Sequence, residues 1–377
     1  MHNLLRMREF IFIILTLFVH FGLDAKRVDT FYGPLEVSEP VLLELIDSPP
    51  MQRLKKVYQY GISHFASPFR ENYTRYEHSL GVFAILRMNN APLVEQVAGL
   101  LHDVSHTVFS HVGDHIFDPQ APKEAAKSYQ DDIHLWFLTN YGITKILEKY
   151  GISPQQITPS NESFPRLEEA LPNLCADRID YNLQGAFYRG FLTKKEVLEI
   201  AQDLSFKKGR WVSTKTALMK KMAQFTLFMN LECWGSAENY IISGWLAEIF
   251  SKALQLRKIT FEDIHFGTDE LIWNRLRQIP DPFIQERFYR ILHPKRFYSL
   301  VEPDRADIVT SRKFRGIDPW IQTGSAVMRL TEMDQELRDQ FEEQQELLAK
   351  GWAIKLAMLS QSRPPEEESV FTPPIFA

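Results

Sequence analysis

Histidine and aspartate are concentrated in three short segments of this chain of 377 residues. Six of its eleven histidines lie between positions 78 and 134. The segments are 75–78 (Arg-Tyr-Glu-His), 102–115, which opens on His-Asp, and 177–181 (Asp-Arg-Ile-Asp-Tyr). Imidazole nitrogens with carboxylate oxygens, and no thiolate, suit a divalent ion such as Mn, Fe, Ni, Zn or Mg. Such an ion lowers the pKa of a bound water towards about 7 and polarises a phosphoryl oxygen, so the segments predict metal-assisted hydrolysis.

The spacing within each segment is helical. Arg75 and His78 are three residues apart, which places them on one face of a helix. A lone buried histidine is usually a core residue bonded to a carbonyl, and a single His-Asp pair is a weak signal. The joint pattern of a histidine, a His-Asp pair and a distant aspartate favours one shared site. Spacings of three or four recur in the pairs His102 and His106, His111 and Asp114, His111 and His115, and Asp177 with Asp180 or Tyr181.

Amphipathic helices account for most of the chain around these segments. Residues 92–103, for example, carry Val94, Val97 and Leu101 on one apolar stripe. The sequence therefore predicts a mainly α-helical fold. We predict helices from near residue 74, over 92–103, 123–149, 166–190, 193–202, 215–256 and 333–360, a loop over 151–165, and a strand at 306–310.

Four stretches together resemble the HD-domain phosphohydrolase superfamily. They are DSPPMQRLKKVYQYG, RYEHSLGV, AGLLHDVSHTVFSH and ADRIDY, which occur in this order within residues 29–190. The closer resemblance is to the deoxynucleoside triphosphate triphosphohydrolases, the branch that contains the sterile-alpha-motif-and-HD proteins. It implies an HD helical core over 29–260 and a smaller mixed α/β C-terminal region over 261–362. No N-terminal sterile-alpha-motif domain is present in the sequence.

The resemblance also assigns a metal centre and catalytic residues. It implies that His106 and His111 line the phosphate side of the pocket, with Asp114 orienting His111 as a carboxylate partner. The cofactor would be one of the divalent ions named above. The metal ligands that it implies are His78, His102, Asp103 and Asp177.

A second group of residues is implied to bind the substrate. Arg75 would contact a phosphate, and Arg178 stands where the family has a phosphate-binding lysine. Tyr181 would touch the sugar, and Gln59 stands where the family has a glutamine in the nucleoside pocket. Gln59 and Asp180 could equally be structural hydrogen-bonding groups.

The sequence departs from the family pattern at two places. The triphosphohydrolases have a further catalytic histidine followed by glutamate, where this chain has Gln130-Asp131, with His134 one turn later. Their arginine- and histidine-rich helix corresponds here to 226–242, which contains no arginine, lysine or histidine. A neutral wall fits a tetra-anionic substrate poorly. We therefore expect a mono- or diphosphorylated or cyclic nucleotide more than a deoxynucleoside triphosphate.

Composition excludes several classes of protein. A net charge of −5 gives no basic excess for general nucleic-acid binding. Two cysteines exclude a disulfide-rich scaffold and a thiolate zinc site. The resemblance leaves a homo-oligomer open.

The N-terminal segment resembles a secretory signal. Arg6 and Arg8 precede the apolar run 10–19, and the small residue Ala25 follows it. Residues 1–25 are therefore interpreted as a signal peptide or an N-terminal anchor. A signal peptide predicts an exported or periplasmic protein. If the segment is not a signal peptide, the protein is expected to be cytoplasmic or membrane-anchored. No other stretch could span a bilayer, and the acidic, proline-rich tail 363–377 is expected to be flexible.

The leading hypothesis is a metal-dependent phosphohydrolase that uses a metal-bound water to cleave a nucleotide or a related phosphate ester. A catalytically weak nucleotide- or protein-binding HD module is one alternative, motivated by Gln130. A deoxynucleoside triphosphate triphosphohydrolase is another. A purely structural helical protein would bind no metal.

Overall fold

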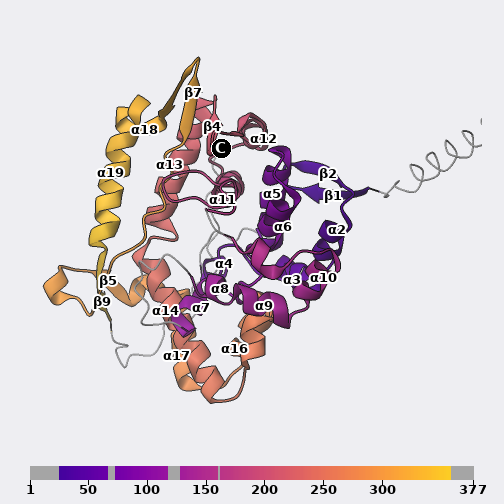
Figure 1. Cartoon of the computed structure of the whole chain (residues 1–377). Helices are drawn as coiled ribbons and strands as arrows, with labels where there is room; N and C mark the ends of the chain where they lie inside the picture. Colours follow the sequence, from indigo (N-terminus) through magenta and orange to yellow (C-terminus); the bar gives the residue numbers. More distant parts are fainter. Residues whose placement is uncertain (1–24, 67–72, 118–127, 160–161, 358–377) are drawn as a thin grey trace, which may run out of the picture.

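The computed structural model describes residues 25–66, 73–117, 128–159 and 162–357. Helices dominate these ranges, and the strands form small sheets (Figure 1). The predicted mainly α-helical fold with a mixed C-terminal region is therefore confirmed. The predicted leader, up to residue 24, and the predicted tail lie outside the described residues, so both stay predictions. None of the helices in the described ranges combines the length and apolar character needed to cross a bilayer.

The described residues of the first half start with an antiparallel hairpin, β1 (Lys26–Thr30) and β2 (Gly33–Val37), and continue in short helices. The prediction of one continuous helix over 123–149 is wrong, because the described part of this range forms separate short helices. Within its described part the chain is bent at Ile133 and again at Gly142, whose φ of +84° leaves the helical region. The helices are α2 (Pro40–Ile46), α3 (Pro49–Arg53), α4 (Ser63–Ala66), α5 (Arg75–Met88), α6 (Leu93–Leu101), α7 (Val112–Phe117), α8 (Tyr129–Asp132), α9 (His134–Asn140) and α10 (Ile143–Lys149).

The second half contains the longest helices. The helix predicted over 166–190 starts only at Ala176, because Pro172 disfavours a helical residue before it and the chain is irregular up to Cys175. The helix predicted over 215–256 is interrupted at 233–236, which includes Gly235. The helices are α11 (Ala176–Tyr188), α12 (Lys194–Asp203), α13 (Thr216–Glu232), α14 (Ala237–Gln255), α15 (Phe261–His265), α16 (Asp269–Arg277), α17 (Pro282–Leu292), α18 (Leu330–Met333) and α19 (Gln335–Lys350).

Two further sheets attach the C-terminal region to the helical core. One has the order β3-β4-β7-β8, in which β4 and β7 are parallel, and the other has the order β5-β9-β6. The predicted strand at 306–310 is confirmed as β6. The helix predicted over 333–360 is wrong at its end, because Gly351, with φ +77°, stops the helix and strand β9 follows. The strands are β3 (Ser205–Lys207), β4 (Arg210–Ser213), β5 (Tyr298–Leu300), β6 (Ile308–Thr310), β7 (Trp320–Thr323), β8 (Ala326–Arg329) and β9 (Trp352–Leu356).

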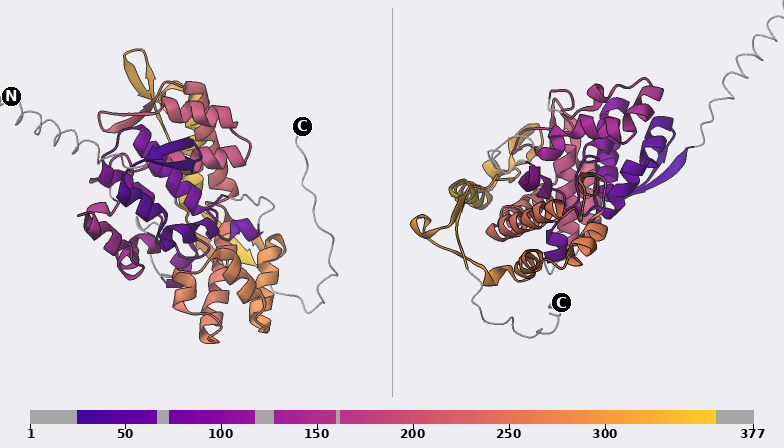
Figure 2. Two further views of the ribbon diagram at one scale, coloured as in Figure 1. Left: turned by 90° about the vertical axis from the view of Figure 1, so that its right-hand side faces the viewer. Right: turned by 90° about the horizontal axis from the view of Figure 1, so that it is seen from below.

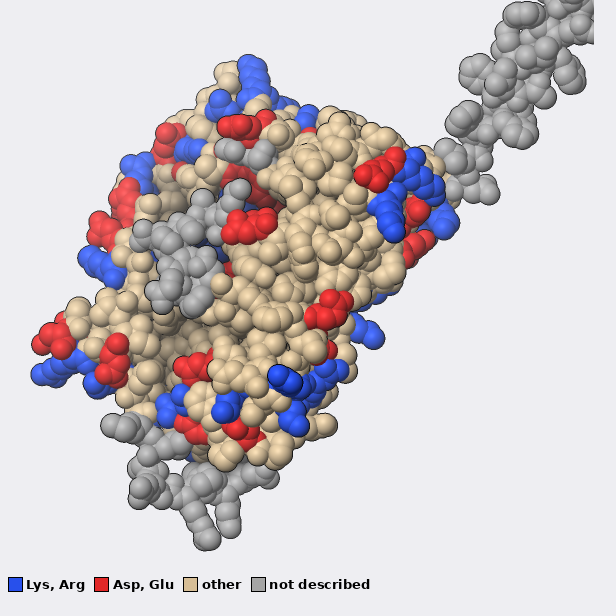
Figure 3. All heavy atoms as spheres, turned by 60° about the horizontal axis from the view of Figure 1, so that its bottom comes forward, with Lys and Arg blue, Asp and Glu red and all other residues tan. Residues whose placement is uncertain are grey.

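Two hydrophobic clusters hold the fold together. The larger cluster packs α5, α6, α11 and α13 against one another, and α19 lies along α13 at the edge of the molecule (Figure 1). The smaller cluster joins α7 to α14, α16 and α17, which form the orange and salmon helices in Figure 2. On the face drawn in Figure 3, basic and acidic side chains are interspersed rather than gathered by sign.

The buried side chain of Arg53 connects the two clusters. It donates hydrogen bonds to the carbonyls of Val104 and His106, next to the His-Asp pair, and to those of His265 and Gly267 at the end of α15. Its exposed fraction is 6%. The guanidinium therefore supplies hydrogen-bond partners to four carbonyls, three of them in buried bonds.

Replacing Arg53 with methionine is expected to lower the free energy of unfolding by about 3 kcal/mol or more, because buried carbonyls lose charge-assisted hydrogen bonds. Urea denaturation followed by circular dichroism measures the change. Lys56→Met, an exposed position three residues away, is the matched control and should stay within about 0.5 kcal/mol of the parent. An unchanged midpoint for Arg53→Met would contradict this role.

Candidate metal centre

The start of α5 places the first histidine. Thr74 caps the helix, and its backbone N–H donates to Glu77 Oε2 at 2.7 Å, so the two residues form a capping box. The cap fixes the first turn, which presents Arg75 and His78 to the interior. Both are buried, with exposed fractions of 3% and 1%.

The end of α6 and the start of α11 supply the other predicted ligands. His102 is the C-cap residue of α6, and Asp103 follows it outside the helix. His102 and His106 therefore do not share a helix face: the chain turns, with the His106 N–H donating to the Asp103 carbonyl at 3.1 Å. Asp177 lies in the first turn of α11, where the positive end of the helix dipole favours a carboxylate.

The four predicted metal ligands converge on one point. His78 Nε2 lies 3.1 Å from His102 Nε2 and 3.0 Å from Asp177 Oδ1. The nearest Asp103 oxygen is 3.5 Å from Nε2 of each histidine. His78, His102 and Asp103 are all buried and form a group that can hold a metal ion.

The hydrogen bonds of the two rings show that this group fits a cation. His78 Nδ1 lies 2.7 Å from Asp180 Oδ2, and His102 Nδ1 lies 2.8 Å from the carbonyl of Gly99. Both partners accept hydrogen bonds, so both Nδ1 atoms carry the proton. The facing Nε2 atoms then lie beside two carboxylates, which raise the pKa of His78 and His102 against the effect of burial. A divalent cation would take the place of the protons that this negative charge attracts.

Asp180 is the structural support of His78. Besides the ring, it accepts hydrogen bonds from the hydroxyls of Tyr32, at 2.8 Å, and Tyr73, at 3.1 Å, and from the amide of Gln184, at 3.0 Å. Its exposed fraction is zero. A Cβ atom at Gly81 would collide with its carboxylate, which explains the glycine within α5. These contacts make Asp180 a structural hydrogen-bonding group, as the sequence analysis allowed.

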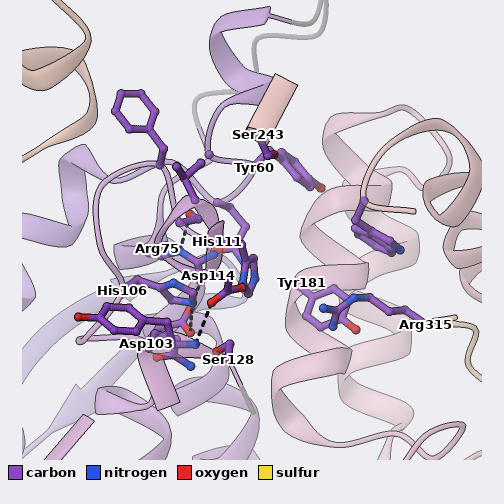
Figure 4. Close-up of a pocket in the computed structure, with 18 of the residues that line it drawn as sticks. Tyr60, Arg75, Asp103, His106, His111, Asp114, Ser128, Tyr181, Ser243 and Arg315 are labelled. Carbon is purple, nitrogen blue, oxygen red and sulfur yellow. Dashed lines mark hydrogen bonds and ion pairs between the residues drawn. The ribbon is translucent and has the colours of Figure 1, made fainter. Parts of the chain in front are cut away.

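A cleft with a cavity volume of about 440 Å³ opens above these ligands. It is lined by all four ligands and by the three predicted catalytic residues, His106, His111 and Asp114. Figure 4 shows His106 and His111 on one side of the cleft, and the two rings meet edge to face at 5.1 Å. Asp114 Oδ2 lies 3.3 Å from His111 Nδ1, which is the contact needed for the orienting role that the resemblance implies.

The charge of His106 is set by its surroundings. Its Nε2 lies 3.2 Å from Asp103 Oδ1. Burial and the nearby charge of Arg75 lower the pKa of His106 to about 3, despite the Asp103 carboxylate. This shift favours the neutral ring at physiological pH.

The predicted substrate residues also line the cleft. Arg75 donates to Asp103 and, at 2.9 Å, to Ser110 Oγ. Arg178 and Tyr181 face the cleft from α11, and Gln59 lies before α4. The Gln59 Oε1 atom is buried and has no hydrogen-bond partner among the described residues.

Gln130 and Asp131, which stand where the family has its further catalytic histidine and glutamate, lie in the cleft, whereas His134 does not. Gln130 and Asp131 line the cleft, and the Gln130 Oε1 atom accepts a hydrogen bond from Ser105 at 3.0 Å. His134 lies behind Ser105, with its Nδ1 atom 3.0 Å from Ser105 Oγ, and it is not among the cleft-lining residues. The described contacts therefore do not place His134 where it could replace the family histidine.

The stretch 226–242 gives the cleft only neutral residues, as predicted, but the conclusion that the cleft therefore lacks a basic wall is wrong. Arg312, Lys313 and Arg315 line the cleft from the loop between β6 and β7, as Figure 4 shows for Arg315 opposite the histidines. Glu168 also lines it, and burial and the charge of Asp177 raise the pKa of Glu168 to about 7. The basic run SRKFRG was visible in the sequence, but no spacing links it to segments more than 130 residues earlier.

No protein-family model matches the chain. The uncharacterized protein YdhJ of Bacillus subtilis is 31% identical over 329 residues, which make up 87% of this chain and 98% of that protein. The metal-dependent phosphohydrolase cns2 of Cordyceps militaris is 30% identical over 299 residues, 77% of this chain and 83% of its own length. The chain belongs to the HD-domain family of metal-dependent phosphohydrolases. It is a hydrolase that acts on phosphate esters.

One further relative matches a smaller part of the chain, and two solved structures share its fold. The human deoxynucleoside triphosphate triphosphohydrolase SAMHD1 is 30% identical over 158 residues, 37% of this chain and 25% of that protein. A phosphohydrolase from Bacteroides thetaiotaomicron has a TM-score of 0.59 at 17% identity, covering 82% of this chain and 95% of its own. A hypothetical protein from Aquifex aeolicus also has a TM-score of 0.59, at 19% identity, covering 85% and 99%.

Proposed function

We propose that this HD-domain phosphohydrolase acts on the phosphate ester of a nucleotide. The observation that carries the proposal is the composition of the cleft, which joins the metal ligands to cationic side chains and to the unpartnered Oε1 atom of Gln59. A buried acceptor without a partner is costly, and a base or sugar donor would satisfy it. Tyr181 and Trp234, which meet edge to face at 5.8 Å, add aromatic surface to the cleft. The name of the SAMHD1 relatives agrees with a nucleotide substrate.

A divalent ion held by His78, His102, Asp103 and Asp177, when bound, supplies a water of lowered pKa and polarises a phosphoryl oxygen. Arg75 stabilises the negative charge that develops on the phosphoryl oxygens, and its bond to Asp103 fixes its position. Arg178 neutralises a further phosphate oxygen, held in place by a hydrogen bond of 2.8 Å to the Asn173 carbonyl.

Proton transfer to the leaving oxygen is assigned to His111. Its Nδ1 atom faces Asp114, which leaves Nε2 as the atom that can donate the proton. Because His106 is buried and neutral, we assign it to hydrogen bonding beside Asp103.

A hydrolysis screen tests the proposed function. The chain without residues 1–24 is loaded with Mn and offered nucleoside mono-, di- and triphosphates, cyclic nucleotides, and sugar phosphates without a base, with products identified by mass. A higher kcat/KM for nucleotides than for the sugar phosphates supports the proposal, with Asp177→Asn as the inactive control. Equal rates on both sets contradict the nucleotide assignment. Binding of an unchanged nucleotide, without turnover of any compound, favours the binding-module alternative.

A further inference from the structure

The loop between β6 and β7 brings positive charge into a cleft whose metal ligands come from the other end of the chain. Residues 311–319 connect β6, which pairs with β9, to β7, which pairs with β4. Both ends of the loop are therefore fixed in sheets. Arg312, Lys313 and Arg315 line the cleft in company with Arg178 from α11.

Neutral residues of the 226–242 stretch anchor this loop. Asn230 Oδ1 accepts a hydrogen bond from the Arg315 N–H at 2.9 Å. The Trp234 carbonyl accepts one from the Arg312 guanidinium at 2.8 Å. The Arg312 N–H also donates to the Leu348 carbonyl of α19, at 2.9 Å. Residues of the stretch without basic side chains thus hold the loop that carries the basic ones. Because the loop backbone is anchored, less conformational entropy is lost when a ligand binds to it.

The cationic side chains of this loop form no ion pair among the described residues, although the carboxylates of Asp131 and Glu168 line the same cleft and act on Lys313 at longer range. Within the described ranges, Arg178 and Arg312 donate to backbone carbonyls, and the Lys313 and Arg315 side chains enter no ion pair. Burial and the charges of Arg315 and Arg178 lower the pKa of Lys313, so these cations lie close enough to repel one another. Such a cluster is relieved by a bound polyanion.

We infer that Lys313 and Arg315, with Arg178, form a second anionic subsite that holds phosphate groups other than the one under attack. The preferred substrates are then nucleoside di- or triphosphates rather than monophosphates. This inference rests on the proposed function and deepens it. The physical reason is charge: each added phosphate brings negative charge that Arg75 and the metal centre alone do not match, whereas the loop offers partners for charge-assisted hydrogen bonds.

The double variant Lys313→Gln/Arg315→Gln tests the subsite by binding as well as by activity. Calorimetry on the full metal-free chain measures the affinity for inorganic triphosphate and for orthophosphate. We expect the parent to bind triphosphate more tightly than orthophosphate. The variant should lose about tenfold or more in triphosphate affinity and less than about twofold in orthophosphate affinity. Lys207→Gln/Lys208→Gln, which removes the same charge at exposed positions outside the cleft, should change neither.

The activity arm separates this inference from the proposed function. On Mn-loaded protein, the ratio of kcat/KM for a nucleoside triphosphate to that for its monophosphate should fall about tenfold or more in the Lys313/Arg315 variant. If calorimetry shows that the parent binds triphosphate more tightly than orthophosphate, and that the variant loses this difference, the subsite is supported even when no nucleotide is hydrolysed. The subsite would be refuted if the variant lost equal affinity for triphosphate and orthophosphate, or if its affinities were unchanged. It would also be refuted if the parent bound both anions equally well. Thermal melts confirm that the variant is folded.

Discussion

Replacing Asp103 with asparagine is expected to empty the metal centre and to lower kcat by at least about a thousandfold, because hydrolysis then lacks a water of lowered pKa. The asparagine amide is a poorer ligand than a carboxylate. It also leaves the buried guanidinium of Arg75, which Asp103 neutralises, facing the site, and this charge repels a cation. Metal content by mass spectrometry and turnover of the best substrate measure the two effects.

Asp114→Asn is the matched control for this prediction. It changes a carboxylate of the same cleft that contacts His111 rather than the ligand cluster. This variant should keep its metal and lose activity only through the weaker orientation of His111. If Asp103→Asn retained a full complement of metal, or if Asp114→Asn lost its metal as well, the assignment of the ligands would be wrong.

Replacing Asp180 with asparagine is expected to weaken metal binding by about tenfold to a hundredfold without changing any ligand. The asparagine amino group would face the donors that now converge on the carboxylate, and His78 would lose its charged partner. The ring is then held less firmly and is a weaker base. Competition with a chelator of known affinity measures the change.

A graded comparison separates this orienting role from a general loss of stability. Tyr32→Phe removes one of the donors to Asp180 and should weaken metal binding in the same direction but by less. Tyr150→Phe removes a hydrogen bond of the same kind, to Glu44 at 2.8 Å, far from the cleft, and should leave metal affinity unchanged. Equal affinity in all three variants would refute the role of Asp180.

The four metal ligands were predicted through the resemblance to the HD-domain family, and the structure brings them together at helix ends that local patterns also indicate. The capping residues of α5, the end of α6 at His102 and the start of α11 before Asp177 are short-range signals. They place each ligand at a helix terminus or in a first turn, and the order of the motifs indicates that they belong to one site. The helical class of the fold follows from the same periodicity.

The lengths of several helices depended on the tertiary structure. Residues 166–175 were predicted as helix, but they form an irregular segment in which the Arg166 carbonyl accepts a hydrogen bond from the buried Trp211 indole. Such contacts join residues distant in sequence and override local propensity. Strand β9 likewise exists because β5 and β6 offer it partners on both sides.

The sequence by itself indicated a divalent-ion site, because imidazole and carboxylate ligands are a matter of residue type, and the resemblance to the HD-domain family supplied the four ligands. Only the tertiary structure decided the charge of the cleft. Lys313 and Arg315 reach it through a loop fixed by β6, β7 and Asn230, and no local rule links position 315 to position 78. Electrostatics acts through space, so a wall that is neutral along the chain becomes basic once distant segments pack together.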